Sequence, residues 1–175
     1  MSPPGGGAAT EGARAEHPNA TLVRRFYAAF DRRDGAAMAA CYTADARFSD
    51  PVFPDLRGER IGAMWRMLCL GAKDLKVTLS HVRADDHKGS ARWEATYTFS
   101  RTGRRVRNSI AADFVFRDGL IERHSDDFDF KAWAGQALGW MGKLFGGTHQ
   151  LKAKVRKDAA ARLARFAGPD GAPPA

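Results

Sequence analysis

The chain has 175 residues, 44% of them hydrophobic, which is enough to bury the core of one compact domain. Its formal net charge is +8, but the segment from Lys131 onward, with eight Lys or Arg against two acids, accounts for +6 of it. Residues 17–130 carry only about +3, so this balance argues against a main domain that binds nucleic acid.

Other features place the chain among soluble proteins of a reducing compartment. Its two cysteines, Cys41 and Cys69, lie on apolar faces of predicted helices and lack the spacing of a metal site. No apolar run approaches the length of a membrane span. Residues 1–16 are rich in Pro, Gly and Ala without a signal-peptide core, so we expect a disordered leader and a cytoplasmic protein.

Helical periodicity occurs three times in the first part of the chain. Residues 18–33 have an apolar face, and Pro18 suits a first helical turn. Asp34 can cap a second helix, which is expected to bury its side chains as far as Tyr42. A short strand over residues 47–53 precedes a third helix over residues 59–70.

Four strand-like segments follow the third helix. They cover residues 75–84, 91–100, 105–117 and 120–130, and short polar turns that contain glycine separate them. Such turns join antiparallel neighbours. The order predicts an α+β fold in which a cone-shaped, curved antiparallel sheet wraps around the three N-terminal helices.

One face of the second and third of these strands is apolar. Because alternate side chains of a strand share a face, this series is expected to cover the helices and to line a pocket. The expected lining is Phe26, Tyr27, Trp65, Tyr97, Ile110, Phe114 and Phe116. Asn108 interrupts the apolar face and could donate a hydrogen bond to a ligand. Trp65 and Tyr97 can equally be ordinary core residues, because aromatic side chains dominate both environments.

The C-terminal part is predicted to be a helical extension over residues 131–167, with a flexible tail over residues 168–175. Its last helix, residues 148–167, carries an apolar stripe that includes Leu151, Val155, Leu163 and Phe166. Such a stripe must dock on the domain, on a second subunit or on an anionic surface. We favour a homodimer and keep a membrane surface as the less favoured alternative.

Residues 22–130 resemble the nuclear transport factor 2-like superfamily, in particular its SnoaL-like and ketosteroid-isomerase-like branch. The matching segments are Phe26-Tyr27-Ala28-Ala29-Phe30 with Asp34-Gly35, Tyr42-Thr43-Ala44-Asp45-Ala46, Ser49-Asp50-Pro51-Val52, and Phe114-Val115-Phe116-Arg117-Asp118-Gly119. The resemblance implies the cone fold over residues 17–130. In this superfamily the outer sheet face commonly forms dimers, so the resemblance also implies a homodimer here.

The same resemblance suggests a base and limits the reaction. Ketosteroid isomerases use an Asp base followed by Pro-Val, which Asp50 matches. Their oxyanion-binding Tyr and Asp align with Phe26 and Ala112 here, with Tyr27 and Asp113 one residue away. Because one residue turns a side chain to another face, ordinary steroid isomerisation is not expected.

Two carboxylates are the candidate catalytic groups, each with an alternative. Asp50 is a general base at the pocket mouth, or Asp-Pro only shapes a turn. Asp126, with His124 two residues before it on the last strand, is an acid or orienting group, or the pair is a solvated strand end. Without a bulge in the last hairpin, Arg123 and Asp127 face the pocket instead.

These observations predict a protein that binds a small apolar or polycyclic molecule. One hypothesis is an enzyme that uses this pocket as a cofactor-independent isomerase, cyclase or hydrolase. The alternative is a non-catalytic ligand-binding or dimeric assembly module. No cofactor and no metal are expected, because phosphate loops, dinucleotide motifs and metal spacings are absent from the sequence. A basic turn with Arg101, Arg104, Arg105 and Arg107 is a solvated edge or, alternatively, a site for a phosphate-bearing ligand.

Overall fold

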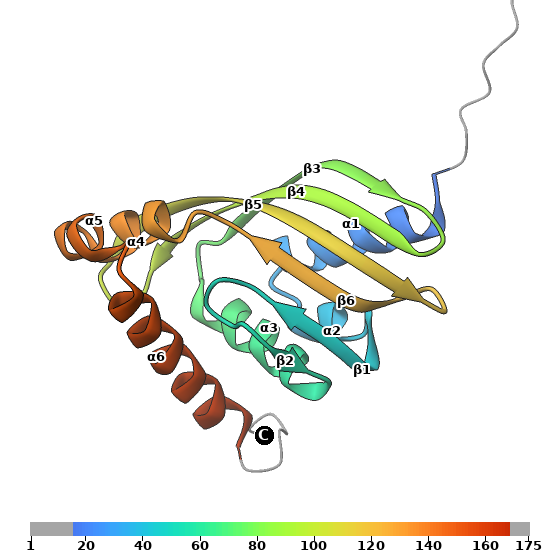
Figure 1. The fold of residues 1–175 in the computed structure, drawn as a ribbon. Helices are drawn as coiled ribbons and strands as arrows, with labels where there is room; N and C mark the ends of the chain where they lie inside the picture. Colours follow the sequence, from blue (N-terminus) through green and yellow to red (C-terminus); the bar gives the residue numbers. More distant parts are fainter. Residues whose placement is uncertain (1–15, 169–175) are drawn as a thin grey trace, which may run out of the picture.

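The fold is a curved six-stranded sheet with helices packed in its concave side (Figure 1). The computed structural model describes residues 16–168, so nearly all of the predicted leader and tail lies outside the described residues. The helices are α1 (Pro18–Asp31), α2 (Gly35–Ala39), α3 (Glu59–Gly71), α4 (Phe130–Leu138), α5 (Trp140–Phe145) and α6 (His149–Ala167). The strands are β1 (Tyr42–Ser49), β2 (Leu56–Arg57), β3 (Lys76–Ala84), β4 (Lys88–Phe99), β5 (Arg104–Arg117) and β6 (Leu120–Asp127).

Helix starts follow from short polar side chains that cap free backbone N–H groups. The carboxylates of Asp34 and Asp129 accept from N–H groups at the starts of α2 and α4, both at 2.9 Å. The Thr148 hydroxyl does the same for α6 at 3.3 Å. These local signals explain why helix positions could be predicted from the sequence.

The strand order is β2-β1-β6-β5-β4-β3, and the predicted antiparallel run from β3 to β6 is confirmed. One pair differs from the prediction, because β1 lies parallel to β6. Tyr42 begins β1 and pairs with Ile121 instead of ending the second helix. Sheet pairing therefore overrides the helical pattern at Tyr42, and α2 ends at Ala39.

The core lies between the inner sheet face and helices α1 and α3. Its largest fully buried side chains include Trp65, Tyr27, Phe26 and Phe48. The rings of Phe26 and Trp65 meet edge to face, with centroids 5.3 Å apart. The alternation predicted for β4 and β5 holds, since the inward series is buried or half-buried.

A β-bulge decides which side chains of β6 face inward. Phe116 pairs with Ile121, but Val115 pairs with Arg123, so Glu122 is an extra residue in β6. The extra residue switches the side of every following side chain. His124 and Asp126 are consequently buried, while Arg123 and Asp127 are exposed.

Helix α6 lies across the open end of the cone and docks on its own domain (Figure 1). Leu163 is fully buried and Ala167 is 5% exposed, within a single chain. Burial of a leucine side chain stabilises the docked helix by roughly 1.5–3 kcal/mol. The apolar stripe of α6 therefore packs on its own domain, which is one of the three docking places expected for it, and a homodimer stays a prediction.

Candidate functional site

A pocket of about 230 Å³ lies between the inner sheet face, α3 and α6. Its walls are mainly aromatic and aliphatic side chains, the composition typical of small-molecule sites. The larger apolar lining residues are Phe30, Phe53, Met64, Trp65, Met67, Leu75, Trp93, Phe99, Ile110, Phe128, Trp133 and Val155. Helix α6, which follows the predicted cone domain in sequence, therefore contributes directly to the wall.

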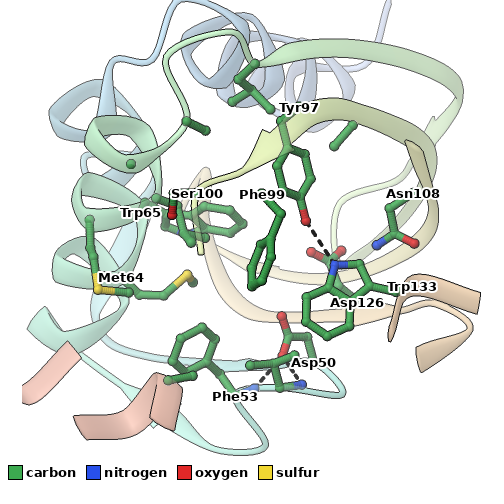
Figure 2. Close-up of a pocket in the computed structure, with 18 of the residues that line it drawn as sticks. Asp50, Phe53, Met64, Trp65, Tyr97, Phe99, Ser100, Asn108, Asp126 and Trp133 are labelled. Carbon is green, nitrogen blue, oxygen red and sulfur yellow. Dashed lines mark hydrogen bonds between the residues drawn. The ribbon is translucent and has the colours of Figure 1, made fainter. Parts of the chain in front are cut away.

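Asp50 follows β1 and lies in the pocket wall (Figure 2). Its Oδ1 accepts hydrogen bonds from the backbone N–H groups of Val52, at 2.6 Å, and of Phe53. The two expectations for this residue are therefore compatible, because one oxygen shapes the turn while the carboxyl group lines the pocket.

Burial raises the pKa of Asp50 from 3.8 to about 6. The two backbone hydrogen bonds lower this pKa, and the nearby charge of Asp126 raises it further. Desolvation is the largest of these effects. A carboxyl group with a pKa near 6 is mostly ionised at neutral pH and can still exchange a proton at low cost.

Asp126 is the second carboxyl group in the pocket wall and is only 5% exposed. Its Oδ1 is 3.0 Å from Nε2 of His124 and accepts a hydrogen bond from Nε1 of Trp93 at 3.3 Å. His124 is fully buried and does not line the pocket, so it can act on a ligand only through Asp126. Asp50 and Asp126 lie near each other in the pocket wall, beside Trp133 (Figure 2).

A chain of hydrogen bonds runs behind Asp126 through His124 and Tyr42 to Trp65. Trp65 Nε1–H donates to the Tyr42 hydroxyl at 3.0 Å, and this hydroxyl lies 2.7 Å from Nδ1 of His124. Indole N–H is only a donor, so the Tyr42 hydroxyl accepts from Trp65. His124 in turn contacts Tyr42 through Nδ1 and Asp126 through Nε2, so Tyr42 and His124 hold the Asp126 carboxylate in place.

Two further polar groups reach the pocket. The Tyr97 hydroxyl accepts from Trp133 Nε1 at 2.9 Å, which leaves its own proton free to donate (Figure 2). Burial raises the pKa of Tyr97, and the charge of Asp50 raises it as well, so the hydroxyl stays protonated. The amide of Asn108 lines the pocket and makes no side-chain hydrogen bond with residues 16–168. Both groups can donate to a ligand oxygen.

The structure brings five of the eight predicted site residues together in the pocket wall, whereas His124, Tyr27 and Phe114 do not line it. Trp65, Tyr97, Asn108, Asp50 and Asp126 all contribute to the pocket wall. Two predicted lining residues, Tyr27 and Phe114, do not line it, and the same holds for Phe26 and Phe116. These four rings fill the core deeper in the cone, so their inward direction was predicted correctly but their depth was not.

Three contributors to the site were missed in the sequence. Tyr42 was predicted to end a helix, so its position in β1, beside the last strand, was not expected. Trp93 and Trp133 were not predicted as site residues, although an indole N–H needs a partner when it is buried. The need of a buried indole N–H for an acceptor is the sequence signal that could have identified Trp93 and Trp133.

The cross-strand partner of Asp126 is Ala112. The resemblance to ketosteroid isomerases aligns Ala112 with a carboxyl group, which this chain lacks at that position. Because directly paired residues project to the same face, Asp126 supplies a carboxyl group from the neighbouring strand. The small side chain of Ala112 leaves room beside it.

The family model for the SnoaL-like domain matches residues 23–124. Among solved structures, TerC co-crystallised with polyporic acid is 17% identical, with a TM-score of 0.61 over 70% of this chain and 100% of that chain. TsrD from Streptomyces laurentii is 25% identical, with a TM-score of 0.60 over 71% and 96% of the two chains.

An M. tuberculosis LEH-like epoxide hydrolase is 20% identical, with a TM-score of 0.59 over 73% of this chain and 93% of that chain. The likenesses below 25% identity show a shared cone fold. No curated protein sequence matches the chain. Asp126 and helices α4 to α6 lie beyond the segment that the family model matches.

Proposed function

Because the chain belongs to the SnoaL-like domain family, we propose that its pocket binds a small, mainly apolar molecule and catalyses a cofactor-independent acid–base reaction on it. The reaction class is an isomerisation, a cyclisation or a hydrolysis. One observation carries the proposal: two carboxyl groups, Asp50 and Asp126, face one apolar pocket, and each is held by a single oxygen. Such an arrangement costs stability and is typical of functional sites.

Asp50 is the general base in this proposal. Its pKa of about 6 keeps it ionised at neutral pH while leaving it basic enough to accept a proton. Asp126 orients the ligand and stabilises positive charge, and His124 and Tyr42 hold its carboxylate in place. Tyr97 and Asn108 supply hydrogen-bond donors for an oxygen that becomes negative during the reaction.

Comparison with other cones supports a ligand-binding role. TerC was crystallised with polyporic acid, and the M. tuberculosis protein is described as an epoxide hydrolase. Both ligand and activity belong to those proteins, and they support only the general class here. The buried free thiols of Cys41 and Cys69 fit a reducing compartment such as the cytoplasm.

A non-catalytic role in assembly is the second candidate, and exposed apolar residues on α5 favour it. Trp140, Met141, Leu144 and Phe145 are 67%, 44%, 68% and 47% exposed. Four large apolar side chains on one short helix suit a contact with a second copy. Light scattering on the chain and on the double variant Trp140→Ser, Leu144→Ser tests this role, since a homodimer through α5 becomes monomeric in the variant.

A metabolite-extract screen by native mass spectrometry tests the enzymatic proposal. Ligands retained by the chain are incubated with it, and products are compared with those of Asp50→Asn. Asp127→Asn is the matched control, because Asp127 is exposed on the outer face of the strand that carries Asp126. Loss of turnover in Asp50→Asn alone supports the base, whereas equal turnover removes Asp50 from the mechanism.

A further inference from the structure

Two of the carboxylates that line the pocket, Asp50 and Asp126, lie at the sheet, whereas the other charged lining residues, Arg101, Asp158 and Arg162, come from the turn after β4 and from α6. Within residues 16–168, no hydrogen bond reaches the second oxygen of Asp50 or of Asp126. The wall residues from the sheet interior and from α3 include no lysine or arginine. The groups that contact these carboxylates are two backbone N–H groups at Asp50, and the indole N–H of Trp93 and the imidazole of His124 at Asp126.

Among residues 16–168, Asp126 has an imidazole nitrogen, Nε2 of His124, at 3.0 Å, whereas the hydrogen-bond partners of the Asp50 carboxylate are backbone N–H groups. Carboxylates in an apolar pocket are costly unless a cation pairs with them. The donors that hold Asp50 are uncharged backbone N–H groups, so a positive charge on the ligand is a suitable partner for this carboxylate.

Aromatic side chains surround the same space. Trp65, Trp93, Tyr97 and Trp133 line the pocket together with both carboxylates. Aromatic faces attract cations, most strongly those of tryptophan, and the attraction increases when the cation loses its water. An apolar pocket with aromatic walls and buried anions is the chemistry that recognises an organic ammonium ion.

We infer that the ligand is a protonated amine or quaternary ammonium ion with an apolar body, its cationic group held between Asp50 and Asp126. The inference rests on the proposed function, because it assigns a substrate class to the same pocket. It adds a requirement that an apolar ligand alone does not satisfy, namely a permanent or pH-dependent positive charge.

Arginines at the rim do not oppose this assignment. Arg101 is paired with Asp158 at 3.1 Å, so its charge is balanced at the mouth. Arg156 donates to the backbone carbonyl of Pro51 instead of to a pocket carboxylate. Arg162 is an exposed residue at the edge, beside Gly71. A cation that enters the pocket therefore meets arginines whose charge is paired or exposed to solvent before it reaches the carboxylates.

The test uses benzyltrimethylammonium and neopentylbenzene, which have the same shape and differ in charge. Binding is followed at pH 7.5 and low salt by tryptophan fluorescence, because three of the four tryptophans line the pocket. We expect the cation to bind about tenfold more tightly or better, the factor of one desolvated cation–π contact. Asp50→Asn should weaken cation binding by about tenfold, and Asp127→Asn should leave it unchanged.

The pH dependence adds a readout, because the charge of the quaternary probe does not change with pH. The groups that face Asp50 are Asp126 and His124 on β6, Tyr97 on β4, and Arg156 on α6 at the Pro51 carbonyl. Since the pKa of Asp50 is about 6, affinity for the cation should increase from pH 5 to pH 7. In Asp50→Asn this increase should be absent.

The outcomes separate the inference from the proposed function. Equal or tighter binding of neopentylbenzene overturns the cationic ligand and leaves an apolar-ligand pocket intact. Cation binding that is unchanged in Asp50→Asn also overturns the inference. If neither probe binds at millimolar concentration, the pocket is not a site of this size class, and the proposed function fails with the inference. Circular dichroism of each variant establishes that it is folded.

Discussion

Replacement of Asp50 by asparagine should stabilise the protein, and the gain should depend on pH. In the folded chain the pKa of Asp50 is about 6, compared with 3.8 for an aspartate that is not perturbed by the fold. A difference of about two units corresponds to about 3 kcal/mol. An asparagine side chain can still accept both backbone hydrogen bonds with its oxygen, so the variant removes the buried charge and keeps the turn.

The direction follows from proton binding. Between about pH 4 and pH 6 the folded chain holds a proton on Asp50 that the unfolded chain has released, so the stability of the wild type decreases as pH increases. Below pH 4 both states are protonated and the penalty is absent. Above pH 7 the penalty is complete, so Asp50→Asn should exceed the wild type by about 3 kcal/mol there and by only about 0.5 kcal/mol at pH 4.

Urea unfolding at pH 4, 5, 6 and 7.5, followed by tryptophan fluorescence, measures this difference. Asp127→Asn is the control, since an exposed surface substitution is expected to change stability by less than about 0.5 kcal/mol. A stability difference that does not change with pH, or a variant less stable than the wild type at pH 7.5, would refute the argument. It would mean that Asp50 is hydrated or paired and is not a half-buried carboxylate whose charged form is disfavoured in the folded chain.

Three further predictions concern packing and the buried hydrogen-bond chain. Tyr42→Phe should lower the free energy of unfolding in urea by about 1–3 kcal/mol, because it leaves Nδ1 of His124 and the indole N–H of Trp65 without a partner. An unchanged midpoint would contradict the proposed chain of buried hydrogen bonds. Leu163→Ala should cost about 2–5 kcal/mol, whereas the exposed Leu144→Ala should cost less than about 0.5 kcal/mol, and equal effects would show that α6 is not docked. Gly142→Ala should lower the thermal midpoint in calorimetry, since its Cβ would lie 1.8 Å from a carbonyl oxygen of α4; a normal midpoint would argue against this close helix contact.

Local patterns were enough to predict much of the fold. Apolar alternation predicted the inward series of β4 and β5, because the period of a strand assigns its faces without tertiary information. Asp34 capped a helix start as expected, and glycine-containing turns joined the antiparallel strands of the meander. The position of Asp50 between β1 and α3 likewise followed from its sequence neighbours.

The site itself depends on relations that only tertiary structure provides. One extra residue, Glu122, turns His124 and Asp126 inward, and the sequence pattern of β6 was compatible with either face. The parallel pairing of β1 with β6 places the Tyr42 hydroxyl beside His124, although 82 positions separate them. A bulge and a long-range strand pairing leave no local periodicity, because the energy that selects them comes from burial and hydrogen bonding in the assembled core.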